Sequence, residues 1–326
     1  MNSVGMRKLI IQIPCFNEEE SIRRTLDALP RTVEPFDSVE VLVIDDGSQD
    51  STVDAARGAG VDHVIRLSHH QGLARAFMAG IEASLKAGAD VIVNTDADNQ
   101  YAASSIGELV KPILDGTAQM VIGARPISEI REFSFFKKLL QRFGSFVVRL
   151  ASGTTIPDAT SGFRAFSRDA AMRLYVYGDY TYTLETVIQA GRKNIPVTSV
   201  PVGVNPVKRP SRLLKSTSSY VYRSVLSILR IFVLYKPLRF FLAVGTLFLV
   251  PGVLLGARFL VRYMQGDGAG HVQSLILAAV LILTAIIVYA VGLLSDLTAS
   301  NRAMLEELRM RMLKREMSDR PDVPSR

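Results

Sequence analysis

Two carboxylates stand two positions apart in Thr95-Asp96-Ala97-Asp98-Asn99-Gln100, directly after an apolar segment that predicts a buried strand. Where the chain turns at a strand end, side chains with this spacing can both face one divalent cation. Mg²⁺ and Mn²⁺ prefer oxygen ligands and usually keep waters, so one or two carboxylates and the phosphates of a ligand complete the shell. Such a metal would bridge a diphosphate and neutralise charge on a departing nucleotide. The alternative is an ordinary solvated turn, because Asp-x-Asp alone is a weak signal.

Two further polar clusters follow predicted strands. In Asp45-Asp46-Gly47-Ser48-Gln49-Asp50, a carboxylate can accept hydrogen bonds from a base N–H or from ribose hydroxyls, and Gly47 permits a tight turn. The alternative is that Ser48 or Asp50 caps the following helix. The segment Pro14-Cys15-Phe16-Asn17-Glu18-Glu19 places a strand end, a turn and a helix N-terminus together, which suits nucleotide groups.

Strand and helix patterns alternate along the N-terminal part of the chain. Short apolar runs predict strands at residues 7–13, 39–44, 63–67, 90–95 and 119–124. Helical spacing of apolar residues predicts helices at residues 18–29, 50–59, 72–87 and 104–115. This alternation predicts a parallel sheet with helices on both faces, an α/β fold. Ligands bind at the carboxyl ends of such strands, where the polar clusters lie.

Membrane segments are predicted in the C-terminal third. Residues 240–257 and 274–294 are uncharged and almost wholly apolar, and the first run continues to residue 262, long enough to cross about 30 Å of hydrocarbon. Long core helices are the alternative. The Gly-rich link at residues 263–273 predicts a hairpin, and the Lys and Arg that flank the spans place both termini in the cytoplasm. We therefore expect an integral protein of a bacterial inner membrane, without an N-terminal signal peptide.

The distribution of charge agrees with a membrane-bound protein. The chain carries 38 basic and 31 acidic side chains, a net charge of +7, yet no acidic residue lies between Glu185 and Asp267. Residues 131–150 mix aromatic and basic side chains, which predicts an amphipathic helix on the membrane surface rather than ordinary core, and a second one is predicted at residues 211–235. With spans beside it, the basic block favours lipid headgroups or phosphate over nucleic acid.

Other classes of protein are excluded by composition. A single cysteine, Cys15, cannot form an internal disulfide, and four scattered histidines do not make a structural zinc site. No Gly-x-Gly-x-x-Gly follows the first strand, which argues against an NAD-dependent enzyme.

Six short motifs occur along the chain in the order Pro14-x-x-Asn17-Glu18, Asp45-Asp46-Gly47-Ser48, Gly72-Leu73-Ala74-x-Ala76, Asp96-Ala97-Asp98-x-Gln100, Gly123-x-Arg125 and Ser161-Gly162-Phe163-Arg164. Together they resemble those of glycosyltransferase family 2, whose members have a GT-A fold. With the span hairpin, the chain is similar to polyprenyl-phosphate sugar synthases such as dolichol-phosphate mannose synthases and bacterial undecaprenyl-phosphate glycosyltransferases. The likeness covers about residues 8–215. It departs at Ser68-His69-His70-Gln71, where many relatives have an Asn, and at Pro210 in the segment Arg209-Pro210-Ser211-Arg212.

The resemblance implies roles for particular residues. Metal ligands would be Asp96, Asp98 and Gln100, with Mg²⁺ or Mn²⁺ as the cofactor. The nucleotide site would be lined by Pro14, Asn17, Glu18 and Asp46. Asp158 and Arg125 would be catalytic, Asp158 as a candidate base and Arg125 facing phosphate charge. Contacts to phosphate or acceptor would come from Arg131, Lys137, Arg164, Arg209, Ser211 and Arg212.

The sequence therefore predicts a GT-A catalytic domain at residues 1–210, a juxtamembrane amphipathic helix at 211–237, two spans at 238–296 and a charged cytoplasmic helix and tail at 297–326. The expected reaction is inverting, metal-dependent transfer of one sugar from a UDP- or GDP-sugar to a polyprenyl phosphate at the cytoplasmic face. The alternatives are a glycolipid synthase with a hydroxyl lipid acceptor and a non-catalytic membrane scaffold. The span hairpin and charged C-terminal helix are compatible with a homotetramer.

Overall fold

The computed structural model describes residues 7–126, 153–154, 156–176, 182–205, 230, 233, 236–266, 270 and 272–318. The chain divides into two compact units. Residues 1–219 and 309–326 form the first, and residues 220–308 form the second.

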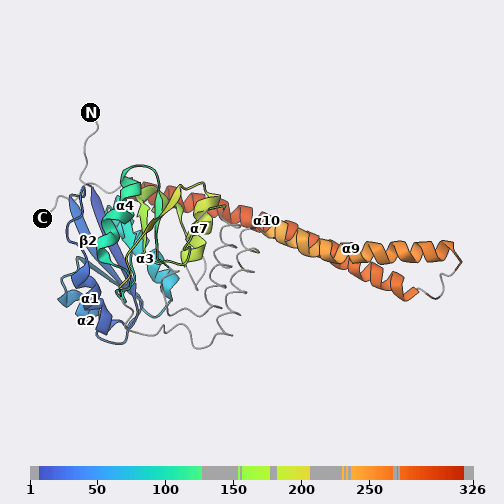
Figure 1. The fold of residues 1–326 in the computed structure, drawn as a ribbon, viewed down its shortest axis with the longest axis horizontal. Coiled ribbons are helices and arrows are strands. Elements are labelled where there is room, and N and C mark those ends of the chain that lie inside the picture. Colours follow the sequence, from blue (N-terminus) through green and yellow to red (C-terminus); the bar gives the residue numbers. More distant parts are fainter. Residues whose placement is uncertain are drawn as a thin grey trace. The chain divides into compact units, whose positions relative to one another are not determined.

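Strands and helices alternate along the first unit, as Figure 1 shows. Its strands are β1 (Lys8–Cys15), β2 (Ser38–Asp45), β3 (His63–Arg66), β4 (Val91–Asn94), β5 (Met120–Ala124), β6 (Arg164–Ser167) and β7 (Val197–Pro201). Its helices are α1 (Glu19–Ala28), α2 (Thr52–Gly58), α3 (Leu73–Lys86), the short η1 (Ala103–Ser105), α4 (Ile106–Leu114), α6 (Arg168–Arg173) and α7 (Tyr182–Arg192). The strands and helices predicted up to residue 124 are confirmed, with ends that differ by at most two residues.

The strands form one mixed sheet in the order β3-β2-β1-β4-β6-β5-β7. Pairing is parallel from β3 through β4 and between β5 and β7, whereas β6 runs antiparallel to both of its neighbours, β4 and β5. The parallel direction expected for the strands up to residue 124 is confirmed, and the later strand β6, which was not predicted, makes the sheet mixed. The alternation of strands and helices, which implies parallel pairing, ends at β5 and carries no information about later strands.

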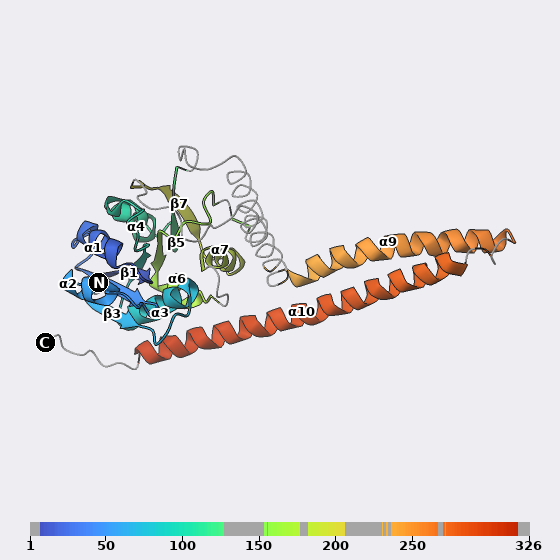
Figure 2. The same ribbon diagram turned by 90° about the horizontal axis from the view of Figure 1, so that it is seen from below.

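Helices cover both faces of the sheet, with α1, α2 and α4 on one side and α3, α6 and α7 on the other (Figure 2). Alternate residues of β1, among them Leu9 and Ile11, pack with Ile22 of α1 in the core of the first side. On the second side, Phe77 of α3 stacks on Tyr182 of α7 with ring centroids 4.0 Å apart. A sheet buried on both faces is a rigid support for the loops at its edge.

Two apolar helices, α9 (Pro237–Met264) and α10 (Val272–Ser318), make up most of the second unit and lie side by side (Figure 2). Small residues let them approach closely: a Cβ on Gly245 would lie 2.4 Å from the ring of Tyr289, whose hydroxyl is 3.0 Å from the Thr246 hydroxyl. Their most apolar stretches reach mean hydropathies of 2.2 and 2.8 and are 11% and 17% buried. By length and composition, both helices are suited to cross a membrane.

The predicted cytoplasmic tail helix is continuous with the second apolar helix. α10 runs from Val272 to Ser318, because no Pro or Gly interrupts residues 293–318. Its last turns belong to the first unit, where Arg309 lies 3.9 Å from Glu82 of α3 and Leu313 is buried. Residues 297–318 are therefore the end of a long helix rather than a separate element.

Candidate active site

The carboxyl ends of the parallel strands carry the polar clusters selected from the sequence. Since β1 lies between β2 and β4, the segments that follow Pro14, Asp45 and Asn94 are neighbours. Arg125 follows β5, which runs in the same direction as β4. The antiparallel β6 starts at this same edge, because Arg164 pairs with Asn94. The fold therefore brings together segments that are up to about 150 residues apart in sequence.

The carboxylates of the predicted metal site follow β4, with Asp96 half-buried and Asp98 exposed. Among the described residues, none donates a hydrogen bond to the Asp96 carboxylate. Burial, and then the charge of Asp98, raises the pKa of Asp96 to about 7. A partly buried carboxylate without a donor, beside a second carboxylate, is an electrostatic situation that a divalent cation relieves.

The turn that follows is held by backbone contacts. The Gln100 N–H donates to Asp98 Oδ1 (3.0 Å), and Asn99 has a left-handed backbone with φ of +57°. Asn205 closes the turn, since its Nδ2 donates to Asn99 O (2.9 Å) and its N–H donates to Gln100 O (2.8 Å). Within the part of the chain that the structure describes, no group of three or more Asp, Glu, His or Cys side chains is arranged so that it could hold a metal ion by itself. A cation here would thus need substrate or water as further ligands.

A buried polar network holds the Gly162 backbone, which packs against Asp96. A Cβ on Gly162 would lie 2.7 Å from both Asp96 carboxylate oxygens, so the Gly162 backbone packs directly against them. Asn94 Nδ2 donates to Gly162 O (2.8 Å) and to the Tyr182 hydroxyl (2.9 Å), and Gln12 Nε2 donates to Asn94 Oδ1 (2.8 Å). Sequence reasoning missed Gln12, Asn94 and Tyr182. For Gln12 and Asn94 the available signal was a polar side chain inside an otherwise apolar strand.

Asp46, which directly follows β2, is buried, and both of its carboxylate oxygens accept hydrogen bonds. Its Oδ1 accepts from the Gln71 N–H (2.8 Å), and its Oδ2 accepts from the Gly72 N–H (2.8 Å) and lies 2.8 Å from His70 Nδ1. The His70 ring in turn stacks on Phe16, with ring centroids 3.9 Å apart and an interplanar angle of 27°. His70 therefore links the predicted nucleotide residue Asp46 to Phe16, whose ring the sequence analysis did not assign to the site.

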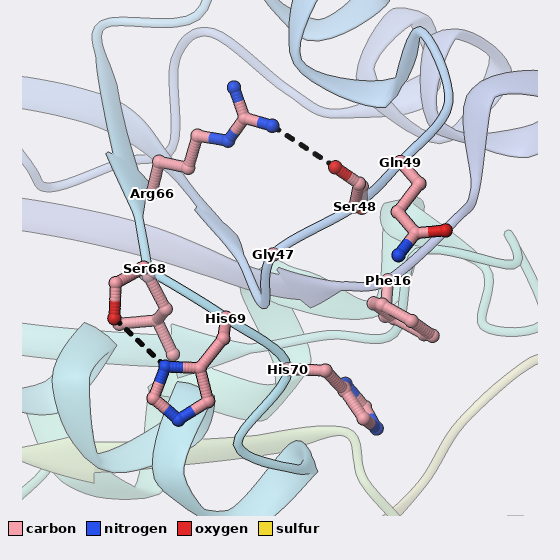
Figure 3. A pocket seen from close by; sticks show the side chains of 9 residues that line it. Phe16, Gly47, Ser48, Gln49, Arg66, Ser68, His69 and His70 are labelled. Carbon is pink, nitrogen blue, oxygen red and sulfur yellow. Dashed lines mark hydrogen bonds between the residues drawn. The ribbon is translucent and has the colours of Figure 1, made fainter.

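A cavity of about 470 Å³ opens beside this group (Figure 3). It is lined by Phe16, Gly47, Ser48, Gln49, Arg66, Leu67, Ser68, His69 and His70. Of the predicted residues, Asn17 contacts this lining, because its Oδ1 accepts from the Gln49 N–H (2.9 Å). The Glu18 N–H donates to Thr52 Oγ1 (2.8 Å), and neither of these two residues lines the cavity. Pro14 is buried within β1. The volume suits a small-molecule group.

Arg125 and Asp158 form an ion pair at the same sheet edge. Arg125 Nε donates to Asp158 Oδ2 (2.8 Å) and Arg125 Nη2 to Asp158 Oδ1 (3.2 Å), while the Thr160 hydroxyl also donates to Oδ1 (2.8 Å). Burial opposes ionisation of Asp158, but the hydrogen bonds and charge of Arg125 lower its pKa below the usual value. A carboxylate in this state is a poor proton acceptor and a firm anchor for Arg125.

Arg164 is completely enclosed. Its guanidinium donates to Ser161 O (2.7 Å), Ala159 O (2.8 Å), Thr183 O (2.7 Å) and the Thr186 hydroxyl (2.6 Å). Burial lowers its pKa to about 10. The sequence predicted a phosphate contact for Arg164, whereas the structure places it between the loop before β6 and helix α7. A role in holding these two elements together fits this position better.

Replacement of Arg164 by Met is expected to destabilise the protein by about 2–4 kcal/mol, because four buried oxygens lose their donor. Thermal unfolding in detergent measures this, and Arg164→Lys, which keeps a charge and some donors, should lie between Met and the wild type. An unchanged unfolding temperature together with a raised KM for the acceptor would instead support direct contact with phosphate.

Several predicted residues lie outside the described part of the chain. They are Arg131, Lys137, Arg209, Ser211 and Arg212, together with both predicted amphipathic helices apart from residues 230 and 233. Their roles remain predictions.

Comparison with known proteins decides the family. Residues 10–175, about half of the chain, match the family described as glycosyl transferase family 2. The chain belongs to glycosyl transferase family 2. It is therefore a glycosyltransferase, and the mixed sheet is that of the GT-A fold.

Relatives in the curated proteins match over the same region. An uncharacterized protein of Methanocaldococcus jannaschii is 31% identical over 62% of this chain and 83% of its own length. The undecaprenyl-phosphate mannosyltransferase of Micrococcus luteus is 30% identical over 60% of this chain and 83% of its own. The polyprenol monophosphomannose synthase of Mycolicibacterium smegmatis is 28% identical over 60% of this chain and 77% of its own.

Among solved structures, a glucosyl-3-phosphoglycerate synthase from Mycobacterium tuberculosis, in complex with Mg²⁺ and uridine diphosphate, has a TM-score of 0.53. It is 22% identical, and the match covers 68% of this chain and 79% of that one. At this identity the likeness concerns the fold.

Proposed function

We propose that this glycosyltransferase moves one sugar from a UDP- or GDP-sugar to a polyprenyl phosphate, with inversion at the anomeric carbon. The observation that carries the proposal is the meeting of three features at one sheet edge: the Asp96–Asp98 pair, the cavity lined by Phe16 and His70 beside Asp46, and the anchored Arg125. Relatives named for transfer of mannose to undecaprenyl phosphate or polyprenol phosphate support the acceptor class.

The nucleotide sugar would bind across the ends of β1, β2 and β4. The cavity beside Phe16 and Asp46 takes the nucleoside, and its diphosphate extends toward the carboxylates that follow β4. Asp96 and Asp98 fit a divalent cation, because one lacks a donor and the other is exposed with one oxygen engaged by an N–H. Mg²⁺ or Mn²⁺, when bound, supplies charge neutralisation for the leaving diphosphate. Gly162 and Asn94 keep Asp96 in place for this task.

The acceptor chemistry follows from the state of Asp158. A lipid monophosphate has a second pKa of about 6, so at pH 7 it is already a strong nucleophile. Its attack on the anomeric carbon needs alignment and compensation of charge more than removal of a proton. Arg125, fixed by Asp158, supplies a positioned cation for that purpose. A single in-line displacement by the lipid phosphate inverts the anomeric carbon.

Replacement of Asp158 by Asn is expected to reduce kcat/KM by about ten- to a hundredfold, because Arg125 loses its anchor but no proton transfer is lost. The dependence of the rate on pH should keep its shape, since Asp158 is ionised throughout the neutral range. Steady-state kinetics between pH 6 and 8.5 measure both quantities. A loss of 10⁴-fold together with removal of a pH-dependent limb would identify Asp158 as a general base and favour a hydroxyl acceptor.

The two apolar helices support a location of this chemistry at a membrane. Lys236 and Arg239 lie at the start of α9, and Arg302, Arg309 and Arg311 lie in the last third of α10. We assign these basic ends, and with them both termini and the catalytic unit, to the cytoplasmic side. Arg131, Lys137, Arg209, Ser211 and Arg212 are proposed to contact the acceptor phosphate or lipid headgroups.

A transfer assay in detergent tests the proposal. The purified protein meets a panel of UDP- and GDP-sugars, undecaprenyl phosphate and Mn²⁺ or Mg²⁺, and lipid products are read by mass spectrometry. We expect a sugar-phosphate-lipid product from one donor, and its disappearance with EDTA. Consumption of no donor under any condition would favour the alternative of a membrane scaffold on a transferase fold.

A further inference from the structure

His70 occupies the position in the proposed nucleotide cavity where a nucleobase would bind. Its imidazole covers one face of the Phe16 ring at a centroid distance of 3.9 Å (Figure 3). Its Nδ1 lies 2.8 Å from Asp46 Oδ2. The side chain is 55% exposed, so it occupies the mouth of the cavity rather than the core.

These contacts are those that a nucleobase would make. A flat heterocycle with an N–H group needs an aromatic platform and a carboxylate acceptor, and Phe16 and Asp46 offer both. Because aromatic planes stack about 3.5–4 Å apart, a base does not fit between Phe16 and His70 as they stand. On Asp46, the Gly72 N–H also donates to Oδ2 and the Gln71 N–H donates to Oδ1, so the place that a base N–H would take on Oδ2 is the one that His70 Nδ1 holds.

We propose that His70 is an internal substitute for the base: it occupies the Phe16–Asp46 position in the nucleotide-free enzyme and leaves when the donor binds. The inference rests on the proposed nucleotide-sugar donor. Occupied by His70, the pocket keeps Phe16 and Asp46 arranged between turnovers. The return of His70 competes with the nucleotide diphosphate that remains after transfer, and so favours its release.

The movement is confined to the side chain. The backbone of residues 69–72 is held by the two N–H bonds to Asp46 and by the close approach of Gly47, where a Cβ would lie 2.6 Å from the His69 carbonyl carbon. Gly47 itself has a φ of +76°. A rotation of the exposed imidazole toward solvent therefore opens the position without refolding the loop.

The competition lowers nucleotide affinity in proportion to the fraction of time that His70 is in place. In His70→Ala we expect UDP or GDP, whichever the wild type binds, to bind about three- to tenfold more tightly, the equivalent of one stacking contact. Isothermal titration in detergent with Mg²⁺ measures this. Inorganic pyrophosphate with Mg²⁺, which has no base, should bind both proteins equally.

His63→Ala is the matched control. His63 of β3 is also a well-exposed histidine beside a carboxylate, with its Nε2 2.8 Å from Glu40 Oε2, but it does not line the cavity. Its nucleotide affinity should stay within twofold of the wild type. His70→Asn keeps a side-chain N–H for Asp46 without a ring for Phe16, so its affinity should lie between the wild type and His70→Ala. It also carries the test if the alanine variant does not fold.

Three results would overturn the inference. Weaker nucleotide binding in His70→Ala would mean that the base stacks on the imidazole and that His70 is part of the platform. Equal binding in all variants would mean that His70 and the base do not compete. If neither UDP nor GDP binds the wild type or any variant with Mg²⁺ or Mn²⁺, the proposed donor fails and the inference falls with it.

Discussion

Replacing Asp96 with Asn is expected to abolish sugar transfer and, at the same time, to raise the thermal stability of the metal-free protein. Activity should fall by about 10²- to 10³-fold or more, because a ligand of the charge-neutralising cation is lost. Stability should rise, because the Asp96 carboxylate is half-buried beside Asp98 and lacks a donor among the described residues. A loss of activity together with a gain in stability from one substitution is a result that a general loss of structure would not produce.

The stability gain depends on pH in a defined direction. The pKa of Asp96 is raised from 3.8 to about 7, so ionisation of this group opposes folding progressively from about pH 4 to pH 7. Thermal unfolding in EDTA should therefore separate Asp96→Asn from the wild type most above pH 7 and least near pH 4. Mn²⁺ should raise the unfolding temperature of the wild type alone.

Asp98→Asn is the matched control for this prediction. Asp98 is more exposed than Asp96, so its replacement should remove activity to a similar extent, while the gain in stability, which comes from relief of the repulsion between the two carboxylates, should be smaller. Full activity in either variant, or a less stable metal-free Asp96→Asn protein at pH 8, would contradict the assignment of this pair to the metal.

Gly162→Ala is expected to lower kcat by about a hundredfold without changing any group that touches substrate. The new Cβ would lie 2.7 Å from both Asp96 oxygens and 2.9 Å from the Tyr182 hydroxyl, so the carboxylate or the loop must shift. A displacement of about 1 Å at a catalytic group is enough for an effect of this size. Kinetics at saturating donor, with Mn²⁺ titrated, should show that the variant needs a higher Mn²⁺ concentration for half-maximal activity, because its metal ligand is displaced.

Gly107→Ala is the matching substitution in open space. Gly107 lies in α4 with nothing within 4 Å of the position of a Cβ, and alanine favours helix, so activity should be unchanged and stability slightly higher. Equal kinetics for Gly162→Ala and Gly107→Ala would show that the packing of Gly162 on Asp96 has no bearing on catalysis.

Much of the first unit could be predicted from sequence because its signals are local. A strand that ends on Asp45-Asp46-Gly47 or Thr95-Asp96 shows both the strand and the polar group at its end, and parallel pairing then brings these ends together. The placement of Asp46, Asp96 and Arg125 at one edge follows from this rule alone.

Interactions that depend on distant partners could not be read in the same way. Arg164 belongs to a motif that suggested a phosphate contact, yet its four acceptors come from the loop before β6 and from α7. The stack of Phe16 on His70 joins the segments that follow β1 and β3, and no pattern in the sequence near either residue indicates this contact. The antiparallel direction of β6 likewise depends on a partner strand, β4, about 70 residues earlier.

The acceptor phosphate is the centre of the account, and a matched pair of lipids tests it most directly. With the sugar donor that the enzyme uses and Mn²⁺, transfer to undecaprenyl phosphate is compared with transfer to undecaprenol, which has the same chain and a hydroxyl in place of the phosphate. We expect a lipid-linked product with undecaprenyl phosphate alone. A dianionic phosphate can attack without a base, whereas a hydroxyl would need one, and the ionised Asp158 is held by Arg125. Transfer to undecaprenol or to diacylglycerol at a comparable rate would contradict this expectation.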